Sequence, residues 1–280
     1  MIREVDVSLI SDTVMRLCIE ANRELPRDIC EALEKARGRE TWPTALSILD
    51  GLIENHTLAK QCSAPICQDT GMACVFVELG QDVHLNGSLR EAVDEGVRRG
   101  YGEGYLRKSV VADPIRRVNT GDNTPAMLHI ELVPGSKIRI TVAPKGFGSE
   151  NMSRIEMLRP SDGLDGVRRF VLGAVEKAGP NPCPPVVVGV GIGGSFDQCA
   201  LLAKKALLRP IDRRHPDPFY AALETELLDS INRLGIGPQG FGGRTTALGL
   251  CIETLPTHIA GLPCAVNISC HVTRRKTAVL

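Results

Sequence analysis

Through the N-terminal part of the chain, apolar residues recur every three or four positions, the spacing of one face of an α-helix. This pattern fills residues 7–61 and predicts a helical N-terminal region. The same periodicity returns in residues 88–106 and 164–179, and Gly179 stands where a helix stop is expected. The chain is therefore expected to contain several amphipathic helices.

Short apolar or alternating segments between these helices predict β-strands. The run MACVFVEL at 72–79 is apolar and β-rich, and residues 184–194 form a buried strand pattern that enters a glycine turn. Residues 126–133 and 137–144 alternate apolar and polar positions around PGS, which is the pattern of a β-hairpin. Two further β-rich runs close the chain.

A helix pattern follows the glycine turn, with Ser195 as its expected N-cap. Strands and helices mixed in this order predict an α/β fold (mixed α+β), in which a helical N-terminal region precedes mixed β-sheets flanked by helices. No low-complexity linker divides the 280 residues. We expect a single domain spanning 1–280, or two lobes in which the helical residues 1–61 pack on 62–280.

Composition and charge exclude several classes of function. Hydrophobic residues make up 43% and charged residues 24%, as in ordinary globular proteins. Lys+Arg and Asp+Glu are equal at 33 each, and aromatic residues are only 4%, which argues against a nucleic-acid-binding surface. No apolar run reaches the roughly 18–20 residues of a membrane span, and the start lacks a signal-peptide core. These features predict a cytoplasmic protein that binds neither nucleic acid nor membrane.

The chain contains ten cysteines and no C-x-x-C pair. Cytosolic thiols stay reduced, so most of the cysteines, Cys18, Cys30 and Cys251 among them, are interpreted as small buried residues. Cys67, Cys183 and Cys270 differ because each lies in a turn bounded by proline or glycine, or at the edge of a strand. Three thiolates are one fewer than a closed four-cysteine metal site, and this number leaves one metal position for a substrate. The alternative is that these three cysteines are also packing residues and bind no metal.

The stretch ICQDTG concentrates functional groups in one turn. Cys67, Gln68, Asp69 and Thr70 are consecutive, and Gly71 can adopt backbone angles closed to other residues. So many functional groups in so short a turn seldom serve packing alone. The alternative is that Asp69 or Thr70 only caps the turn.

The glycine-rich segment after residue 184 also allows a nucleotide-binding interpretation. A strand, a glycine turn and a helix start are the parts of a dinucleotide-binding unit. The glycines at 189, 191, 193 and 194 do not fit G-x-G-x-x-G, however, and no acidic residue follows at the expected distance. Tight packing of the turn near Cys183 is the preferred explanation.

Several motifs occur in a fixed order along nearly the whole chain. They are PICQDTG, YLRKS, VNTGDNTPA, KGFGSENMS, PCPP followed by GIGG, GPQGFGGRT, and LPTHIAGLPCAVNISC. Together they closely resemble the alpha subunit of the iron–sulfur (class I) fumarate hydratase and L-tartrate dehydratase family. Motifs that agree in order are far more specific than any one of them.

The resemblance implies a cofactor and its ligands. Cys67, Cys183 and Cys270 match the residues that ligate a 4Fe-4S cluster whose fourth iron is open to substrate. That iron would act as a Lewis acid on the C–O bond that breaks or forms. Four other cysteines match no ligand position and are interpreted as packing residues: Cys62, Cys74, Cys199 and Cys264.

The resemblance also assigns the substrate contacts. Gln68 and Asp69 would contact the substrate, Asp69 as proton donor or acceptor, and Arg107 would clamp a carboxylate with its bidentate guanidinium. Gly148 would lend its backbone amide, and His258 matches the active-site histidine. This chain has Phe147 where some relatives have a small residue.

Other polar residues near these motifs receive lesser roles. Asn119, Thr120 and Asn123 are expected mainly to satisfy backbone groups, because amides in turns commonly do so. His271 follows the expected ligand Cys270 and is expected to support the cluster by hydrogen bonding.

The sequence ends ten residues after Cys270. Fused members of the family carry a second domain that completes the substrate site. We therefore expect a beta subunit to supply that part, in an alpha2beta2 heterotetramer. The expected function is a hydro-lyase (fumarate hydratase-like) of the tricarboxylic acid cycle that interconverts fumarate and L-malate. The alternatives are L-tartrate dehydration to oxaloacetate, or a non-catalytic iron–sulfur protein.

Overall fold

A computed structural model describes residues 2–280. Contacts within the chain group it into two compact units. Of the described residues, unit 1 contains 2–26, 56–147 and 274–280, and unit 2 contains 27–55 and 148–273. The helical N-terminal region is thus shared between the units and does not form a lobe of its own. No helix in the described residues is long and apolar enough to cross a membrane.

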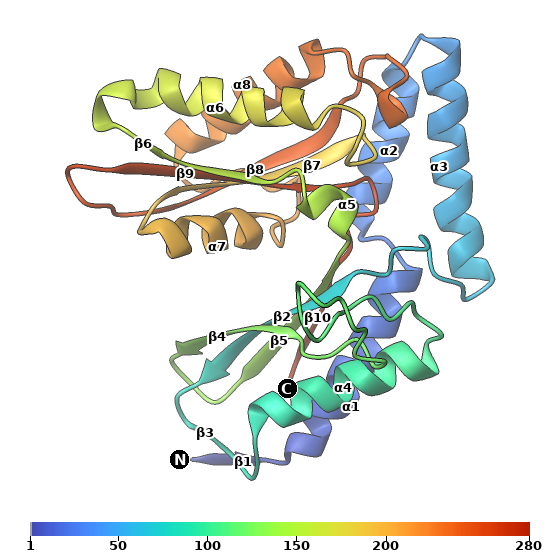
Figure 1. Cartoon of the computed structure of the whole chain (residues 1–280), viewed down its shortest axis with the longest axis vertical. Coiled ribbons are helices and arrows are strands. Elements are labelled where there is room, and N and C mark those ends of the chain that lie inside the picture. Colours follow the sequence, from blue (N-terminus) through green and yellow to red (C-terminus); the bar gives the residue numbers. More distant parts are fainter. Residues whose placement is uncertain (1) are drawn as a thin grey trace. The chain divides into compact units, whose positions relative to one another are not determined.

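Unit 1 is built on a four-stranded mixed sheet with the order β10-β5-β2-β4 (Figure 1). Its strands are β2 (Met72–Gly80), β4 (Met127–Val133), β5 (Ile138–Lys145) and β10 (Lys276–Val279). A two-stranded parallel sheet pairs β1 (Arg3–Val5) with β3 (Val83–Leu85). Since the apolar run predicted at 72–79 has partners on both sides, it becomes the central strand β2.

The predicted hairpin around PGS is wrong. β4 and β5 do not pair with each other, because β2 lies between them. β2 pairs with β4 in parallel and with β5 antiparallel. The alternating pattern identified both strands correctly, but periodicity carries no information on which strand is the neighbour.

Two helices complete the core of unit 1, and both sequence segments that predict them are confirmed. They are α1 (Val7–Arg23) and α4 (Leu89–Glu103), whose N-caps Asp6 and Ser88 accept hydrogen bonds from the first helical turn. The helices pack on each other, and apolar side chains of α1, α4, β2 and β5 form one buried cluster.

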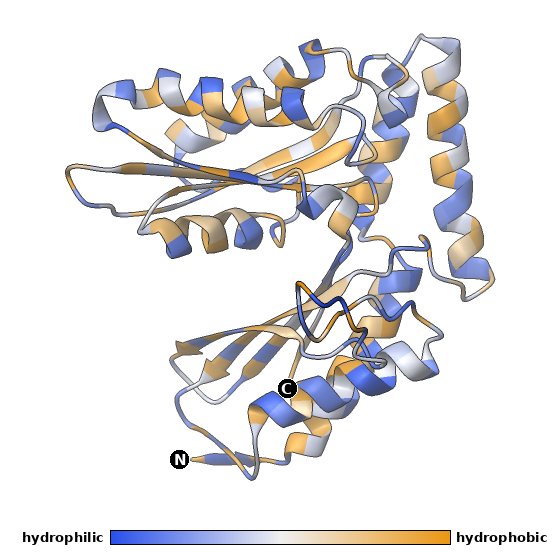
Figure 2. Ribbon diagram, in the orientation of Figure 1, coloured by the Kyte–Doolittle hydropathy of each residue, from blue (hydrophilic) through white to orange (hydrophobic). Residues whose placement is uncertain are grey.

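Unit 2 has three layers: a four-stranded sheet with helices on both faces (Figure 1). The strand order is β6-β9-β7-β8, formed by β6 (Arg154–Leu158), β7 (Val186–Gly193), β8 (Ala247–Leu255) and β9 (Leu262–Ser269). On one face lie α6 (Gly163–Ala178) and α8 (Pro218–Arg233), and on the other lies α7 (Phe196–Ala206). Figure 2 shows the apolar character of β7 and β8, whose residues belong to the main core cluster.

The remaining elements are shorter or lie beside these layers. They are α2 (Arg27–Arg39), α3 (Pro43–Gln61), α5 (Phe147–Glu150) and two short 3-10 helices, Pro160–Asp162 and Pro238–Gly240. Together the elements confirm the predicted mixed α/β class. Gly179 ends α6, as predicted, with a φ of 53°. Ser195 is at the N-cap position of α7, but its hydroxyl binds the Asp197 carboxylate and not a backbone amide.

The glycines of β7 serve packing and do not form a phosphate loop. A Cβ atom on Gly189 would lie 2.2 Å from the Ala203 carbonyl oxygen, and one on Gly191 would lie 2.2 Å from that of Cys199. Since both oxygens belong to α7, only glycine lets this helix approach the strand so closely. This confirms that the segment packs tightly, although its partner is α7 and not the Cys183 turn.

Candidate active site

In unit 1, the Asp69 carboxylate joins two segments of backbone. Its Oδ1 accepts a hydrogen bond from the Gly71 amide at 3.0 Å, and its Oδ2 accepts one from the Phe147 amide at 3.0 Å. Gly71 has a φ of 75°, so this tight turn needs a residue without a Cβ. The two bonds hold both oxygens of a half-buried carboxylate in one orientation.

Buried polar side chains support this turn from beneath. The Tyr101 hydroxyl lies 2.9 Å from the carbonyl oxygens of both Thr70 and Gly71, and burial raises the pKa of this phenol well above its usual value. The phenol therefore stays protonated and can donate. Asn123 Nδ2 donates to the Gly71 carbonyl at 3.2 Å, and its Oδ1 accepts from the Ser109 amide at 2.7 Å.

The other candidate residues of unit 1 lie around the same turn. Thr70 Oγ1 donates to the Arg107 carbonyl at 3.0 Å, so the arginine segment is tied to the turn while the Arg107 side chain is exposed. Gln68 is exposed and Cys67 is half-buried. Unit 1 thus carries a thiol, an amide and a carboxylate in one turn and ties the backbone of Arg107 to that turn.

The structural roles predicted for the VNTGDNTPA residues are confirmed. Asn119 Nδ2 donates to the Lys108 carbonyl, and its Oδ1 accepts from the Gly121 amide. Thr120 Oγ1 donates to the Val110 carbonyl. The hydrogen bonds of these side chains therefore fold the loop that follows Arg107.

In unit 2, Cys183 and Cys270 lie together at one end of the sheet. Cys183 precedes β7 and Cys270 follows β9, and these strands are antiparallel, with Val187 opposite Ser269. His271 Nδ1 lies 3.0 Å from the Cys183 carbonyl oxygen, so this nitrogen carries a proton and donates. Cys183 has a φ of 55°, an uncommon conformation for a residue with a side chain and one that is concentrated at functional sites.

Gln239 is a residue of this group that the sequence did not single out. Its backbone amide and its side-chain Nε2 each donate to the Pro184 carbonyl at 2.8 Å. Its φ of 53° lets both donors reach one oxygen. The only signal in the sequence was one amide side chain inside the glycine-rich run GPQGFGGRT.

The Gly148 loop is anchored at this same end of the sheet. Glu150 accepts a hydrogen bond from Asn267 Nδ2 at 2.7 Å and an ion pair from Lys204 Nζ at 2.5 Å. Ser153 Oγ accepts from Asn267 Nδ2 at 2.8 Å and from the Ile268 amide at 3.1 Å. These bonds explain Glu150 and Ser153 of the GSENMS motif, because they tie the loop to β9.

Gly148 itself has no role in this packing. It is exposed and its φ is not positive, and a Cβ atom there would meet only the Asn181 carbonyl oxygen, at 4.0 Å. The fold of unit 2 therefore tolerates a side chain at this position. A glycine that packing does not require is consistent with close approach of a ligand to the backbone.

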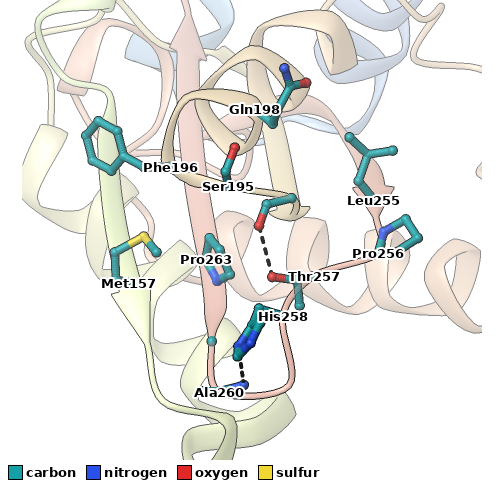
Figure 3. Close-up of a pocket in the computed structure, with 12 residues that line it drawn as sticks. Met157, Ser195, Phe196, Gln198, Leu255, Pro256, Thr257, His258, Ala260 and Pro263 are labelled. Atoms are coloured by element: carbon teal, nitrogen blue, oxygen red, sulfur yellow. Dashed lines mark hydrogen bonds between the residues drawn. The ribbon is translucent and has the colours of Figure 1, made fainter.

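His258 lies in a pocket of about 750 Å³ within unit 2 (Figure 3). The pocket is largely apolar, and its labelled lining includes Met157, Phe196, Leu255, Pro256 and Pro263. His258 Nδ1 accepts a hydrogen bond from the Ala260 amide at 3.1 Å, so Nε2 is the nitrogen left to meet a ligand. Thr257 Oγ1 holds the loop to the Gly194 carbonyl at 2.9 Å.

Unit 2 does not bring His258 to the cysteine pair. His258 precedes β9 and Cys270 follows it, so the eight residues of this strand separate them. At about 3.3 Å per residue, the strand alone spans roughly 25 Å. Within one chain, the His258 pocket and the Cys183–Cys270 group therefore lie at opposite ends of the sheet.

The other cysteines are mostly core residues. Burial raises the pKa of Cys18 to about 12 and that of Cys199 to about 11, and it also raises the pKa of Cys264, so these thiols stay protonated. Cys74 is buried in β2. The interpretation of Cys62 as a packing residue is wrong, because Cys62 is exposed just after α3.

Burial thus separates the three expected ligands from the core thiols. A metal ligand must lose its proton and reach the metal, which a buried thiol cannot easily do. Cys67 and Cys270 are half-buried and Cys183 is exposed, so these three thiols meet that requirement. Cys67 belongs to unit 1, and the other two belong to unit 2. Taken separately, neither unit groups three His, Cys, Asp or Glu side chains for a metal within residues 2–280. Soft thiolates from accessible turns nevertheless suit an iron–sulfur group.

The α/β fold of the chain carries a carboxylate and an amide side by side at one turn, to which the backbone of Arg107 is hydrogen-bonded. A family model described as "Fumarate hydratase (Fumerase)" matches residues 11–279. The chain therefore belongs to the fumarate hydratase (Fumerase) family, and it is a hydro-lyase.

Curated relatives match over almost their full length. A Methanocaldococcus jannaschii protein named "Putative L(+)-tartrate dehydratase subunit alpha" is 44% identical over 273 residues, covering 95% of each chain. The L(+)-tartrate dehydratase subunit alpha of Escherichia coli (strain K12) is 34% identical over 278 residues, covering 98% of this chain and 91% of the relative. That of Escherichia coli (strain UTI89 / UPEC) is 34% identical over 275 residues, covering 97% and 90%. These names describe subunits of a larger enzyme.

Proposed function

We propose that this chain is the alpha subunit of a two-subunit hydro-lyase that removes water from, or adds it to, a four-carbon hydroxy-dicarboxylate. The observation that carries the proposal is the Asp69 turn, where a carboxylate with both oxygens fixed follows the exposed amide of Gln68 and the backbone of the exposed Arg107 is hydrogen-bonded to Thr70. The family match and the subunit names of the relatives support the same assignment.

Each side chain of the turn has a distinct task in this proposal. The Arg107 guanidinium binds one substrate carboxylate through paired N–H groups, and Gln68 donates its amide hydrogens to the same anion. Asp69 gives or takes the proton at the reacting part of the substrate. Its hydrogen bonds to two backbone amides keep the carboxylate aligned for that transfer. Gly148 offers a backbone amide that no side chain covers.

We propose that Cys67, Cys183 and Cys270 hold a 4Fe-4S cluster. When bound, the iron that lacks a thiolate supplies a Lewis acid for the C–O bond. This chain contributes three thiols that are not enclosed in the core, since Cys183 is exposed and Cys67 and Cys270 are half-buried. The His271 bond to the Cys183 carbonyl and the two Gln239 bonds to Pro184 hold the Cys183 turn in its uncommon backbone conformation.

L(+)-tartrate is the first substrate to test. The relatives with curated names are called L(+)-tartrate dehydratase, whereas the sequence motifs first suggested fumarate and L-malate. Loss of water from tartrate would yield oxaloacetate, and loss of water from malate would yield fumarate. The match of the family model to fumarate hydratase keeps the second reaction as the alternative.

The proposed assembly is alpha2beta2. The names of the relatives imply a beta subunit, which would complete the site. The position of His258 favours two alpha chains, because the length of β9 separates it from Cys270 of its own chain. In this proposal His258 serves the site of the other alpha chain.

The test is an anaerobic assay of this chain copurified with its beta partner. Initial rates with L(+)-tartrate, D-tartrate and L-malate are compared at equal enzyme concentration, before and after reconstitution with ferrous iron, sulfide and thiol. We expect turnover of L(+)-tartrate only after reconstitution. Turnover of L-malate alone would reassign the substrate, and no turnover of any hydroxy-dicarboxylate would overturn the proposed function.

A further inference from the structure

Arg274 carries a buried charge that contacts the backbone of the Asp69 turn. It lies two residues before β10, and only 4% of its surface is exposed. Its Nη2 donates to the Asp69 carbonyl at 2.5 Å, and its Nε lies 3.4 Å from the Pro144 carbonyl. The guanidinium thus connects the turn to the end of β5.

The two segments joined by Arg274 are also those joined by the Asp69 carboxylate. Asp69 Oδ2 accepts from the Phe147 amide, three residues after Pro144. A Cβ atom on Gly146, between them, would lie 3.0 Å from Asp69 Oδ2, so the segment closely approaches the carboxylate. Arg274 therefore holds the main chain of Asp69, while the backbone amides of Gly71 and Phe147 hold its side chain.

The charge of Arg274 is not balanced by a neighbouring carboxylate. Within residues 2–280 its hydrogen bonds go to the two backbone carbonyls, it forms no ion pair, and its Nη1 has no hydrogen-bond acceptor. A buried charge without an ionic partner costs several kcal/mol of folding free energy. An apolar residue of similar length would fill this space without that cost, so packing alone does not account for an arginine here.

We propose that Arg274 is a positioning residue for the reaction. It holds the main chain of Asp69 so that the carboxylate keeps its two amide contacts and faces the substrate. This inference rests on the proposed function, because it assigns Arg274 its effect through Asp69. The hydrogen bonds of Arg274 go to main-chain carbonyls, so its effect on the reaction passes through Asp69.

The test compares three variants of the alpha chain, each copurified with the beta subunit. Arg274→Met removes the charge and both donors. Arg274→Lys restores the charge and one donor. Arg139→Met is the matched control, because Arg139 is an exposed arginine of β5 that pairs with Glu78 on the same sheet. Measurements are iron content, kcat, KM, and hydrogen–deuterium exchange of the peptide covering residues 66–72.

For Arg274→Met we expect kcat to fall roughly ten- to hundredfold, with KM changed less than about threefold, because misplacement of a reacting group by about 1 Å costs this much. Arg274→Lys restores the charge but only one of the two donors, so we expect the logarithm of its kcat to lie between the values of Arg274→Met and the wild type, clearly separated from both. Exchange of residues 66–72 should accelerate in Arg274→Met and not in Arg139→Met.

Wild-type kcat in Arg274→Met would overturn the positioning role, and so would equal kcat in the Met and Lys variants. If Arg274→Met does not yield folded complex, Arg274→Lys decides, because an unchanged kcat and exchange rate there would equally refute the proposal. The exchange readout does not depend on activity. An inactive wild-type complex would therefore refute the proposed function, while unchanged exchange in both Arg274 variants would refute only this inference.

Discussion

Replacement of Asp69 by asparagine tests the centre of the proposed site. The two side chains have the same shape, but Asp69 accepts a hydrogen bond on each oxygen, from the amides of Gly71 and Phe147. Asparagine has one oxygen, so its NH2 group must face one of these amide donors. The substitution therefore removes the titratable group and also breaks one of the two bonds that orient it.

The expected changes in kcat and in stability follow from these two losses. Loss of a positioned general acid or base lowers kcat by about 10²- to 10⁴-fold. The side-chain NH2 group of the asparagine would leave one backbone N–H without an acceptor, which costs about 1–3 kcal/mol of local stability. The Arg274, Tyr101 and Asn123 bonds go to backbone carbonyls of the turn and remain, so we expect the chain to fold. Iron content should stay at the wild-type level, because no thiol has changed.

Gly146→Ala provides the matched control. Its new Cβ would lie 3.0 Å from Asp69 Oδ2, so the carboxylate must shift by a few tenths of an ångström while its proton chemistry stays intact. We expect kcat to fall by about tenfold at most. The assay is anaerobic turnover by the complex with the beta subunit, with iron content and chemical unfolding measured on the same preparations.

Two results would refute the reasoning. An Asp69→Asn complex with wild-type kcat would show that no proton passes through this carboxylate. Equal losses in Asp69→Asn and Gly146→Ala would show that position alone matters, and Asp69 would then be a structural residue.

The remaining predictions concern ligands, backbone and pH. Cys183→Ser should abolish iron binding, whereas Cys62→Ser, at another exposed cysteine, should retain it. The measurement is iron per chain after anaerobic reconstitution. Loss of iron in Cys62→Ser and not in Cys183→Ser would make Cys62 the ligand. Gly148→Ala should change unfolding free energy by less than about 0.5 kcal/mol yet raise KM severalfold; an unchanged KM would contradict amide binding. Burial alone would raise the pKa of Asp122, but bonds from Thr124 and Arg98 lower it from 3.8 to about 2. Asp122→Ala should therefore lose about 1 kcal/mol of stability in denaturant titrations above pH 3.8, a difference that disappears as the pH falls through about 2; a difference that persists there would contradict the assignment.

Local elements were largely predictable from the sequence, because periodicity and end signals are properties of neighbouring residues. Helices α1, α4 and α6 and strands β2 and β7 were found from their apolar spacing. The short strands β6 and β10 were missed, because each makes its pairing with a strand distant in sequence and has little apolar pattern of its own.

Strand pairing was decided only by tertiary structure. The hairpin predicted around PGS has the correct strands, but β2 separates them, because an apolar central strand gains hydrogen bonds on both edges. The division of the N-terminal helices between two units could not be predicted from the sequence either. An apolar helix face indicates that the face is buried, but it does not indicate which element covers it.

For the candidate site, the sequence by itself determined which residue types stand in which turns, and the motif order determined the family. Tertiary structure decided how those groups are held. It placed both oxygens of Asp69 on backbone amides, brought Cys183 next to His271, and put His258 at the other end of β9 from Cys270. It also revealed Arg274, which no motif marked. Buried hydrogen bonds between residues far apart along the chain leave no local pattern, so only the folded chain shows them.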